Sequence, residues 1–261
     1  MSPSWGERII IMLSPQQVTL VRWSRGLRPA VRERKTLECA TGGTGPHWQP
    51  ALDVLRPWLT QPGLQAADAY IVLSNHFVRY LLVPWNPDLV TPQEELAFVR
   101  SRFLQVFGDA AEHWMLKLSR PKPEVSGVAC AIERPFLDAL NAAIANSPLT
   151  LRAIQPGLMA AFNGRRRVPR ADAWLVVAEP GHLLLGLLRA GEWHSLRARS
   201  LNGQAAVLAD ILEQERMLVG IESAEEQVYL HRTGNALLDV SGLKIESWLP
   251  GALAQPMGGL S

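Results

Sequence analysis

The start of the chain has the hydrophobic pattern of a three-stranded meander. An apolar run, Ile9 to Leu13, leads into the turn residues Ser14 to Gln17, and Val18 to Arg22 then carries apolar side chains at alternate positions. Such alternation is typical of a half-buried strand, and Ser and Pro between two runs indicate a turn. A second turn at Gly26 precedes Val31 to Leu37, where alternating charged residues predict a half-exposed third strand.

Two segments of the first half show helical spacing. Gln49 to Thr60 carries leucines at helical intervals, which predicts a helix although Pro57 interrupts it. Thr91 to Glu94 has the spacing of a capping box, with proline at the first helical position. It predicts a helix that runs to Phe107 and ends at Gly108. We expect its buried face to consist of Leu96, Val99, Phe103 and Phe107.

Further strands and one helix complete the first half. The predicted strands are Tyr70 to Leu73, Phe77 to Val83, His113 to Leu118, Val125 to Ile132 and Leu149 to Ile154. Ser74 to His76 is expected to form a tight turn between the first two strands, and Arg134 to Ala145 is expected to be a helix.

The second half follows a polar, basic stretch. Its predicted strands are Trp174 to Ala178, Leu183 to Leu188 and Trp193 to Ser200. Asn202 is expected to cap a helix that runs to Val219 and ends at Gly220. The side chains expected to face inward from this helix are Val207, Leu208, Ile211, Leu212 and Leu218.

The two halves match each other when residue n is placed against residue n+165. The identities are Pro15 with Pro180, Gly26 with Gly191, Arg32 with Arg197 and Arg34 with Arg199, without a gap. Self-similarity at a fixed offset indicates an internal repeat. We interpret the chain as a duplication, because the spacing of the turns is preserved as well as their chemistry. The alternative is that two unrelated meanders share turn residues.

These patterns predict an α/β (α+β) chain in two halves. Residues 1–162 form the first half with an inserted subdomain, and 163–171 form a basic linker. Residues 172–249 form the second half, and 250–261 form a flexible tail rich in Pro, Gly and Ala.

Composition and charge narrow the class of protein. With 48% apolar and 19% charged residues the chain is too hydrophobic for disorder, and a net charge of +2 argues against a protein that coats nucleic acid. Cys39 and Cys130 read as two reduced thiols. No apolar run approaches the roughly 20 residues that a membrane-spanning helix needs. We therefore expect a soluble, cytoplasmic protein without a secretory signal.

Motifs of catalysis and of metal binding are absent from the sequence. The six histidines show no metal-ligand spacing, and there is neither a Gly-x-Ser-x-Gly elbow nor a Walker-type phosphate loop. Thr41 to Gly45 resembles a phosphate loop only superficially, because no lysine follows it and Pro46 does. We expect no catalytic residue and no metal site.

A strand meander followed by a helix, present twice, resembles the actin-like ATPase fold. In that fold each half is a ribonuclease H-like subdomain, with mixed sheets flanked by helices, and nucleotide binds where the halves meet. The stretch Leu73 to Tyr80, leading into Val83-Pro84-Trp85 and a capped helix, is similar to the cytoplasmic actin-like platform proteins of type IV pilus and type II secretion systems. The families that it resembles are PilM, MshI and the GspL cytoplasmic domain.

The resemblance implies a nucleotide site at the first hairpin of each half. There an Asp at the end of the first strand holds the metal or its water, and Gly with Ser or Thr lets backbone amides approach the phosphates. The positions in this chain that depart from the pattern are Met12, Ser14 and Pro15 in one hairpin and Val177, Glu179, Pro180 and Gly181 in the other. Each turn contains a proline, which has no N–H to donate, and Glu179 repels phosphate. We expect a pseudo-ATPase without cofactor.

Other interpretations of the hairpins stay open. They are two ordinary β-turns without a ligand, a divalent-ion site at Glu179, or the site of an active ATPase or small-molecule kinase. A binding module unrelated to pili, with the same fold, is a further alternative.

By the same resemblance the chain binds the cytoplasmic segment of an inner-membrane partner, and an assembly ATPase is a second expected partner. Arg79, Tyr80 and Trp85 belong to the resembling stretch and are the candidate partner-binding residues, although such residues also occur in cores. A short extended peptide held at a sheet edge is one mode of such binding. The basic cluster Arg165, Arg166, Arg167 and Arg170 is a candidate for contact with anionic lipid, with a solvated linker as the alternative.

Overall fold

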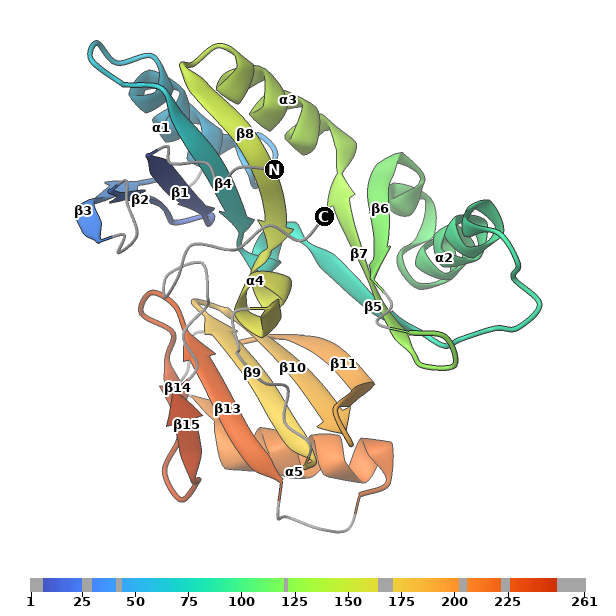
Figure 1. Cartoon of the computed structure of the whole chain (residues 1–261). Coiled ribbons are helices and arrows are strands. Elements are labelled where there is room, and N and C mark those ends of the chain that lie inside the picture. The colour runs from blue at the N-terminus through green and yellow to red at the C-terminus, as the bar shows by residue number, and fades with distance from the viewer. Residues whose placement is uncertain are drawn as a thin grey trace. The chain divides into compact units, whose positions relative to one another are not determined.

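Two five-stranded sheets and a smaller three-stranded sheet hold most of the strands (Figure 1). The computed structural model describes residues 7–24, 30–40, 44–119, 122–163, 171–201, 206–221 and 226–247. Unit 1 contains the described residues up to Val78 together with Ile132–Ala160, and unit 2 contains Arg79–Ala131 and the described residues from Ala161 onward. The inserted subdomain, which the sequence places within the first half, thus shares unit 2 with the second half. The predicted linker and tail fall mostly or wholly outside the described residues.

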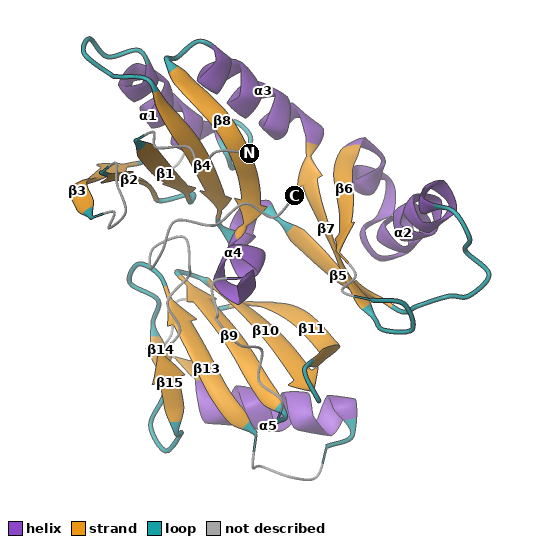
Figure 2. Cartoon of the chain, viewed as in Figure 1, coloured by secondary structure: helices purple, strands orange, loops and turns teal. Residues whose placement is uncertain are grey.

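Unit 1 is built on a mixed sheet in the order β3-β2-β1-β4-β8. Its strands are β1 (Arg8–Leu13), β2 (Gln17–Trp23), β3 (Val31–Glu38), β4 (Ala67–Leu73) and β8 (Leu149–Pro156). The first three are antiparallel, β4 runs parallel to β1, and β8 runs parallel to β4. Helices α1 (Gln49–Leu59) and α3 (Arg134–Ala145) cover one face (Figure 2), because alternate residues such as Ile9, Ile11 and Leu13 supply an apolar surface there.

Unit 2 contains a second sheet in the equivalent order, β11-β10-β9-β13-β15. Its strands are β9 (Ala173–Glu179), β10 (His182–Arg189), β11 (Glu192–Ser200), β13 (Gln227–Arg232) and β15 (Ile245–Ser247). Helix α5 (Leu208–Val219) covers one face, and Trp174, Leu185 and Leu212 lie in the core between them. A short parallel pair, β12 (Ala206–Val207) and β14 (Leu238–Asp239), lies beside this core.

The strand pairing confirms the repeat for the first two strands of each half. Leu13 pairs with Val18 and Ala178 pairs with Leu183, an offset of 165 at both positions. The third strand does not follow this offset. Leu20 pairs with Lys35 whereas Leu185 pairs with Arg197, so Arg197 is equivalent to Lys35 and the matches of Arg32 with Arg197 and of Arg34 with Arg199 are wrong. The offset there is 162, because the loop before the third strand is three residues longer in the first half. Gly26 lies outside the described residues.

The inserted subdomain of unit 2 is a three-stranded sheet covered by a helix. Its strands are β5 (Arg79–Val83), β7 (Gly127–Glu133) and β6 (Trp114–Ser119), in the order β5-β7-β6. Helix α2 (Pro92–Phe107), followed by the 3-10 helix η2 (Gly108–His113), packs on it through Val99 and Phe103. The predicted capping box is confirmed, since Thr91 Oγ1 accepts from the Glu94 amide at 3.2 Å and Glu94 Oε2 accepts from the Thr91 amide at 2.8 Å.

The segment after β4 differs from the prediction of a tight turn between two paired strands. Residues Asn75–Phe77 form the 3-10 helix η1, the next strand begins only at Arg79, and β4 and β5 belong to different sheets. Asn75 Oδ1 accepts from the Leu158 amide at 3.1 Å, at the start of helix α4 (Gly157–Asn163), which the sequence did not predict. This segment therefore caps a helix that lies about eighty residues later in the chain, and does not connect two paired strands.

Two helix faces also differ from the predictions. Helix α5 begins at Leu208, and Val207 lies in β12 and is 37% exposed. Leu218 is 58% exposed because it lies at the margin of the buried face, in the last turn before Gly220 ends the helix. Leu96 of α2 is 42% exposed because the small sheet beneath that helix covers little beyond Val99 and Phe103. Asn202, the expected cap, lies outside the described residues.

Candidate functional site: the two hairpins and the β5 segment

The first hairpin satisfies most of its own backbone amides. The Ser14 amide donates to the Gln17 carbonyl at 3.0 Å, and Ser14 Oγ donates to the same carbonyl and accepts from the Gln17 amide at 3.2 Å. Pro15 has no N–H. Of the four turn residues, all of them described, only Gln16 keeps an amide outside this bonding, and its carbonyl accepts from the Cys39 amide at 2.8 Å. The turn is therefore closed on itself.

The position of the expected metal-binding Asp is apolar. Met12 is half-buried and packs with Ile10 and Val21 on the face of the sheet opposite α1. Its thioether is a poor ligand for the hard cations that accompany nucleotides, which prefer oxygen. Nearby, burial and then the neighbouring Glu38 carboxylate raise the pKa of the Cys39 thiol, which keeps it protonated.

The second hairpin has a two-residue turn. Glu179 pairs with His182 across Pro180 and Gly181, and Gly181 has φ +73°, as the third position of a type II turn requires. Gly234 packs against one side of this turn, so closely that a Cβ on Gly234 would lie 3.1 Å from the Pro180 ring. Glu179 is 5% exposed and Val177 is 1% exposed. The Glu179 side chain is therefore buried at the first position of this turn.

Metal ligands do not gather in the described part of the chain, where no group of three or more His, Cys, Asp or Glu side chains could hold an ion. The interpretation of Glu179 as a divalent-ion site gains no support from these residues. Among the described helices, none combines the length and the apolar character needed to cross a bilayer.

The candidate partner-binding residues lie on and after β5. Arg79 and Tyr80 are successive in the strand, so they point to opposite faces of the small sheet, with Arg79 on the side of Leu81. Tyr80 is 9% exposed, whereas Trp85, which follows the Pro84 stop, is 38% exposed. The structure therefore does not gather the three on one face, and only Trp85 presents a large apolar surface. Arg165, Arg166, Arg167 and Arg170 lie outside the described residues.

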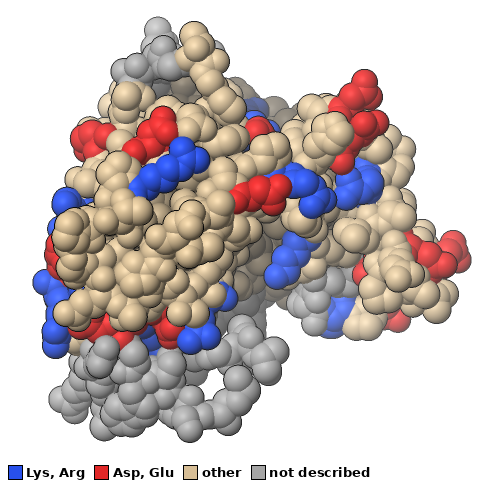
Figure 3. Space-filling view, turned by 90° about the horizontal axis from the view of Figure 1, so that it is seen from above, with Lys and Arg blue, Asp and Glu red and all other residues tan. Residues whose placement is uncertain are grey.

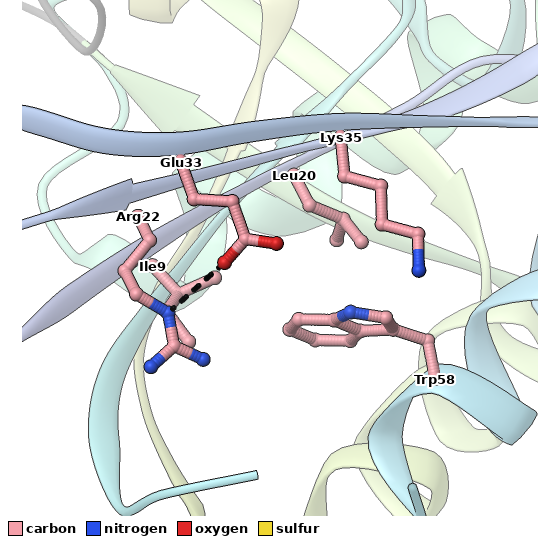
Figure 4. Close-up of a pocket in the computed structure, with 6 residues that line it drawn as sticks. All are labelled: Ile9, Leu20, Arg22, Glu33, Lys35 and Trp58. Atoms are coloured by element: carbon pink, nitrogen blue, oxygen red, sulfur yellow. Dashed lines mark ion pairs between the residues drawn. The ribbon is translucent and has the colours of Figure 1, made fainter.

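Sequence reasoning missed a cavity on the α1 side of the unit 1 sheet. It holds about 210 Å³ of empty space that is open to solvent (Figure 4). The residues that line it are Ile9, Leu20, Arg22, Glu33, Lys35 and Trp58. The alternating charges of β3 were visible in the sequence, but their position above Trp58 depends on how α1 packs on the sheet.

Charge on the molecular surface is mixed. On the face shown in Figure 3, basic and acidic side chains are interspersed among large uncharged areas, and neither sign forms a continuous field. This agrees with the near-balance of 26 basic and 24 acidic residues.

Comparison with solved structures shows the fold. The cytoplasmic domain of EpsL, an inner-membrane component of the Vibrio cholerae type II secretion system, has a TM-score of 0.59 at 12% identity and covers 97% of each chain. A chain of the PilM–PilN type IV pilus biogenesis complex has a TM-score of 0.60 at 17% identity, over 87% of this chain and 81% of that one. A Bacteroides thetaiotaomicron protein with an actin-like ATPase fold has a TM-score of 0.59 at 9% identity, over 89% and 84%.

No protein-family model matches the chain, and no curated protein matches it. The resemblance is thus carried by structure. The chain has the actin-like fold, with mixed sheets flanked by helices, as the sequence predicted.

Proposed function

We propose that this chain is a non-catalytic, actin-like scaffold on the cytoplasmic side of a type IV pilus or type II secretion-like assembly. The observation that carries the proposal is the closed first hairpin, in which the Ser14 and Gln17 amides bond within the turn and Pro15 offers none. A phosphate site needs several amides aimed at the ligand. The fold is that of the actin-like neighbours, two of which come from a secretion system and a pilus complex.

A nucleotide does not fit the residues of either hairpin. Met12 offers no oxygen ligand to a metal, and the buried Glu179 carboxylate would repel the negative charge of phosphates. We therefore derive no chemical step through a bound nucleotide. The alternative, an active ATPase or small-molecule kinase of the same fold, requires these two hairpins to rearrange.

The partner that we propose is the cytoplasmic segment of an inner-membrane platform protein, with an assembly ATPase as a second partner. Trp85 is the best anchor, because aromatic side chains with large exposed surface dominate binding energies at interfaces. Arg79 and Tyr80 are the other proposed contacts. Arg165, Arg166, Arg167 and Arg170 would add about 1 kcal/mol each near an anionic membrane surface, which gives a peripheral location at the inner membrane.

The test is capture from inner-membrane extracts of cells that make pili or a type II secretion system. The immobilised chain should recover a membrane protein of such a machine, and Trp85→Ala should lower the recovery by roughly tenfold or more. Met217→Ala is the matched control, because Met217 is 70% exposed on α5 and belongs to no candidate surface. Recovery of no pilus or secretion component would overturn the proposal, and equal recovery by both variants would remove Trp85 from the interface.

A further inference from the structure

Strand β3 forms one edge of the unit 1 sheet. It pairs with β2 along its length, and no other strand of the described residues lies on its second side (Figure 2). All but one of its eight residues are exposed. An edge strand of this length offers a row of backbone donors and acceptors to an incoming strand.

Hydrogen bonds show which peptide groups face outward. The Cys39 amide donates to the Gln16 carbonyl, so the backbone of Cys39 faces β2. Since residues of an antiparallel strand alternate in direction, the peptide groups of Arg34, Thr36 and Glu38 face away from β2. These three residues define the β3 edge.

The charges along β3 favour an acidic partner. The ion pairs that involve β3 or the strand beside it are Arg22 with Glu7 at 3.3 Å, Arg22 with Glu33 at 3.8 Å and Arg32 with Glu7 at 3.6 Å. Glu38 is the one anion of β3 outside these pairs, against the two cations Arg34 and Lys35. Arg34 and Lys35 have no ion-pair partner among the described residues. Because they are successive, their side chains lie on opposite faces of the sheet, with Lys35 on the α1 side. The β3 edge therefore presents a free cation on each face.

The cavity beneath β3 adds an apolar element. Figure 4 shows the Trp58 indole of α1 facing Leu20, with the Lys35 side chain descending beside it. The hollow is shallow and open to solvent, so it encloses no side chain of a partner, but it places the edge of the Trp58 indole next to β3.

We propose that the β3 edge binds an extended, acidic segment of a partner protein by strand addition. The main chain of that segment bonds to the Arg34, Thr36 and Glu38 peptide groups, its carboxylates pair with Arg34 and Lys35, and an apolar side chain packs over the shallow hollow beside Trp58. The charged side chains of β3 disfavour the apolar strands that cause edge-to-edge aggregation. The inference rests on unit 1 alone and does not depend on the proposed platform role.

The probe is a fluorescein-labelled octapeptide with valine at the third and sixth positions and glutamate elsewhere, which places both residue types on each face. Fluorescence anisotropy with the full chain should show saturable binding. Thr36→Pro removes an outward N–H that β2 does not use, so the fold should tolerate it while affinity falls roughly tenfold. Thr36→Ala is the matched control and should bind within about twofold of the original chain.

Charge reversal and hydrogen exchange complete the test. The double variant Arg34→Glu, Lys35→Glu should abolish binding, whereas Arg102→Glu on the exposed side of α2 should not. In the original chain, bound peptide should slow exchange of the Arg34, Thr36 and Glu38 amides. Absence of saturable binding would overturn the proposal, and so would equal affinity of Thr36→Pro and Thr36→Ala, or protection confined to other strands.

Discussion

Gly186, in the middle of β10, is a residue for which the structure allows no side chain. A Cβ there would lie 2.5 Å from Cζ3 of Trp193, a residue that is 7% exposed. Gly186→Ala should therefore destabilise the protein by about 1–3 kcal/mol, the usual cost of overpacking a core. Urea denaturation followed by circular dichroism measures this change.

The double variant Gly186→Ala, Trp193→Leu is the control for this clash. It should recover stability relative to the two single changes added together, because the smaller side chain leaves room for the new methyl group. Unchanged stability of Gly186→Ala alone would show that the ring moves aside without cost.

Cys130 in β7 has a thiol whose ionisation the fold opposes. Burial raises its pKa from 9.0 to about 11, against the smaller opposing effect of Lys117. The pKa of Cys130 is higher in the folded protein than in the unfolded chain. The free energy of unfolding is therefore fully retained below about pH 9 and falls as the pH rises toward 11, where the unfolded chain loses the thiol proton first. Native Cys130 should react with iodoacetamide at pH 8 far more slowly than after unfolding, as peptide mass spectrometry can measure. Equal rates in the two states would contradict the burial.

At the scale of elements, the first turn of α2 depends on Glu94. Its carboxylate accepts from the Thr91 and Val90 amides, and the bond to the Thr91 amide, then the Thr91 side chain and the Val90 amide, lower the pKa of Glu94 from 4.5. Glu94→Ala should speed hydrogen exchange of the Val90 and Thr91 amides, whereas Gln93→Ala should not. Since the folded pKa is depressed, protection should be complete above about pH 4.5 and lost as pH falls through the lower folded value. If Glu94→Ala leaves the exchange rates of the Val90 and Thr91 amides unchanged, the capping box is not what protects these amides.

The packing of α5 on β11 depends on a buried carboxylate. Glu215 is 1% exposed and pairs with Arg197 at 3.3 Å and Arg199 at 3.0 Å. Glu215→Ala should cost about 1–2 kcal/mol, because it removes a buried carboxylate that two partly exposed arginines share. Asp53→Ala breaks an exposed pair with Arg56 and should cost less than about 1 kcal/mol. Thermal unfolding of the two variants compares them, and similar losses would show that burial adds nothing.

The sequence predicted correctly those helices and strands whose bounds depend on neighbouring residues alone. The Ile9 to Leu13 run and the Thr91 cap were readable because adjacent residues fix them. Helix α4 was missed because its Leu158 amide is capped by Asn75, more than eighty residues earlier in the chain. The register of β3 was misread because it depends on a loop length in the first half that differs from that in the second.

The candidate site could likewise be predicted only where it depends on residues that are neighbours in the sequence. Met12, Pro15 and Glu179 were found because a hairpin turn is local in sequence. The burial of Tyr80 and the cavity above Trp58 were not, since both depend on packing between segments that are far apart in the chain. The sequence pattern thus located the turns, whereas only the structure shows which backbone amides form hydrogen bonds within them.

At the scale of the whole molecule, the structure shows the actin-like fold, and we propose that this chain uses the fold without binding a nucleotide. Each unit contains a five-stranded sheet of the same order, and the likeness to EpsL extends over 97% of the chain. The hairpins that hold phosphate in an actin-like ATPase are here closed or carry a carboxylate. We therefore propose that the chain acts as a scaffold and binds no nucleotide.

Isothermal titration calorimetry of the full chain with ATP and magnesium tests this claim most directly. The account predicts no saturable heat at micromolar nucleotide, because the Ser14 and Gln17 amides and Met12 provide no phosphate or metal ligand. ADP with magnesium should give the same result. Saturable binding of either nucleotide with a micromolar Kd would contradict the account and favour an active ATPase or kinase of the same fold.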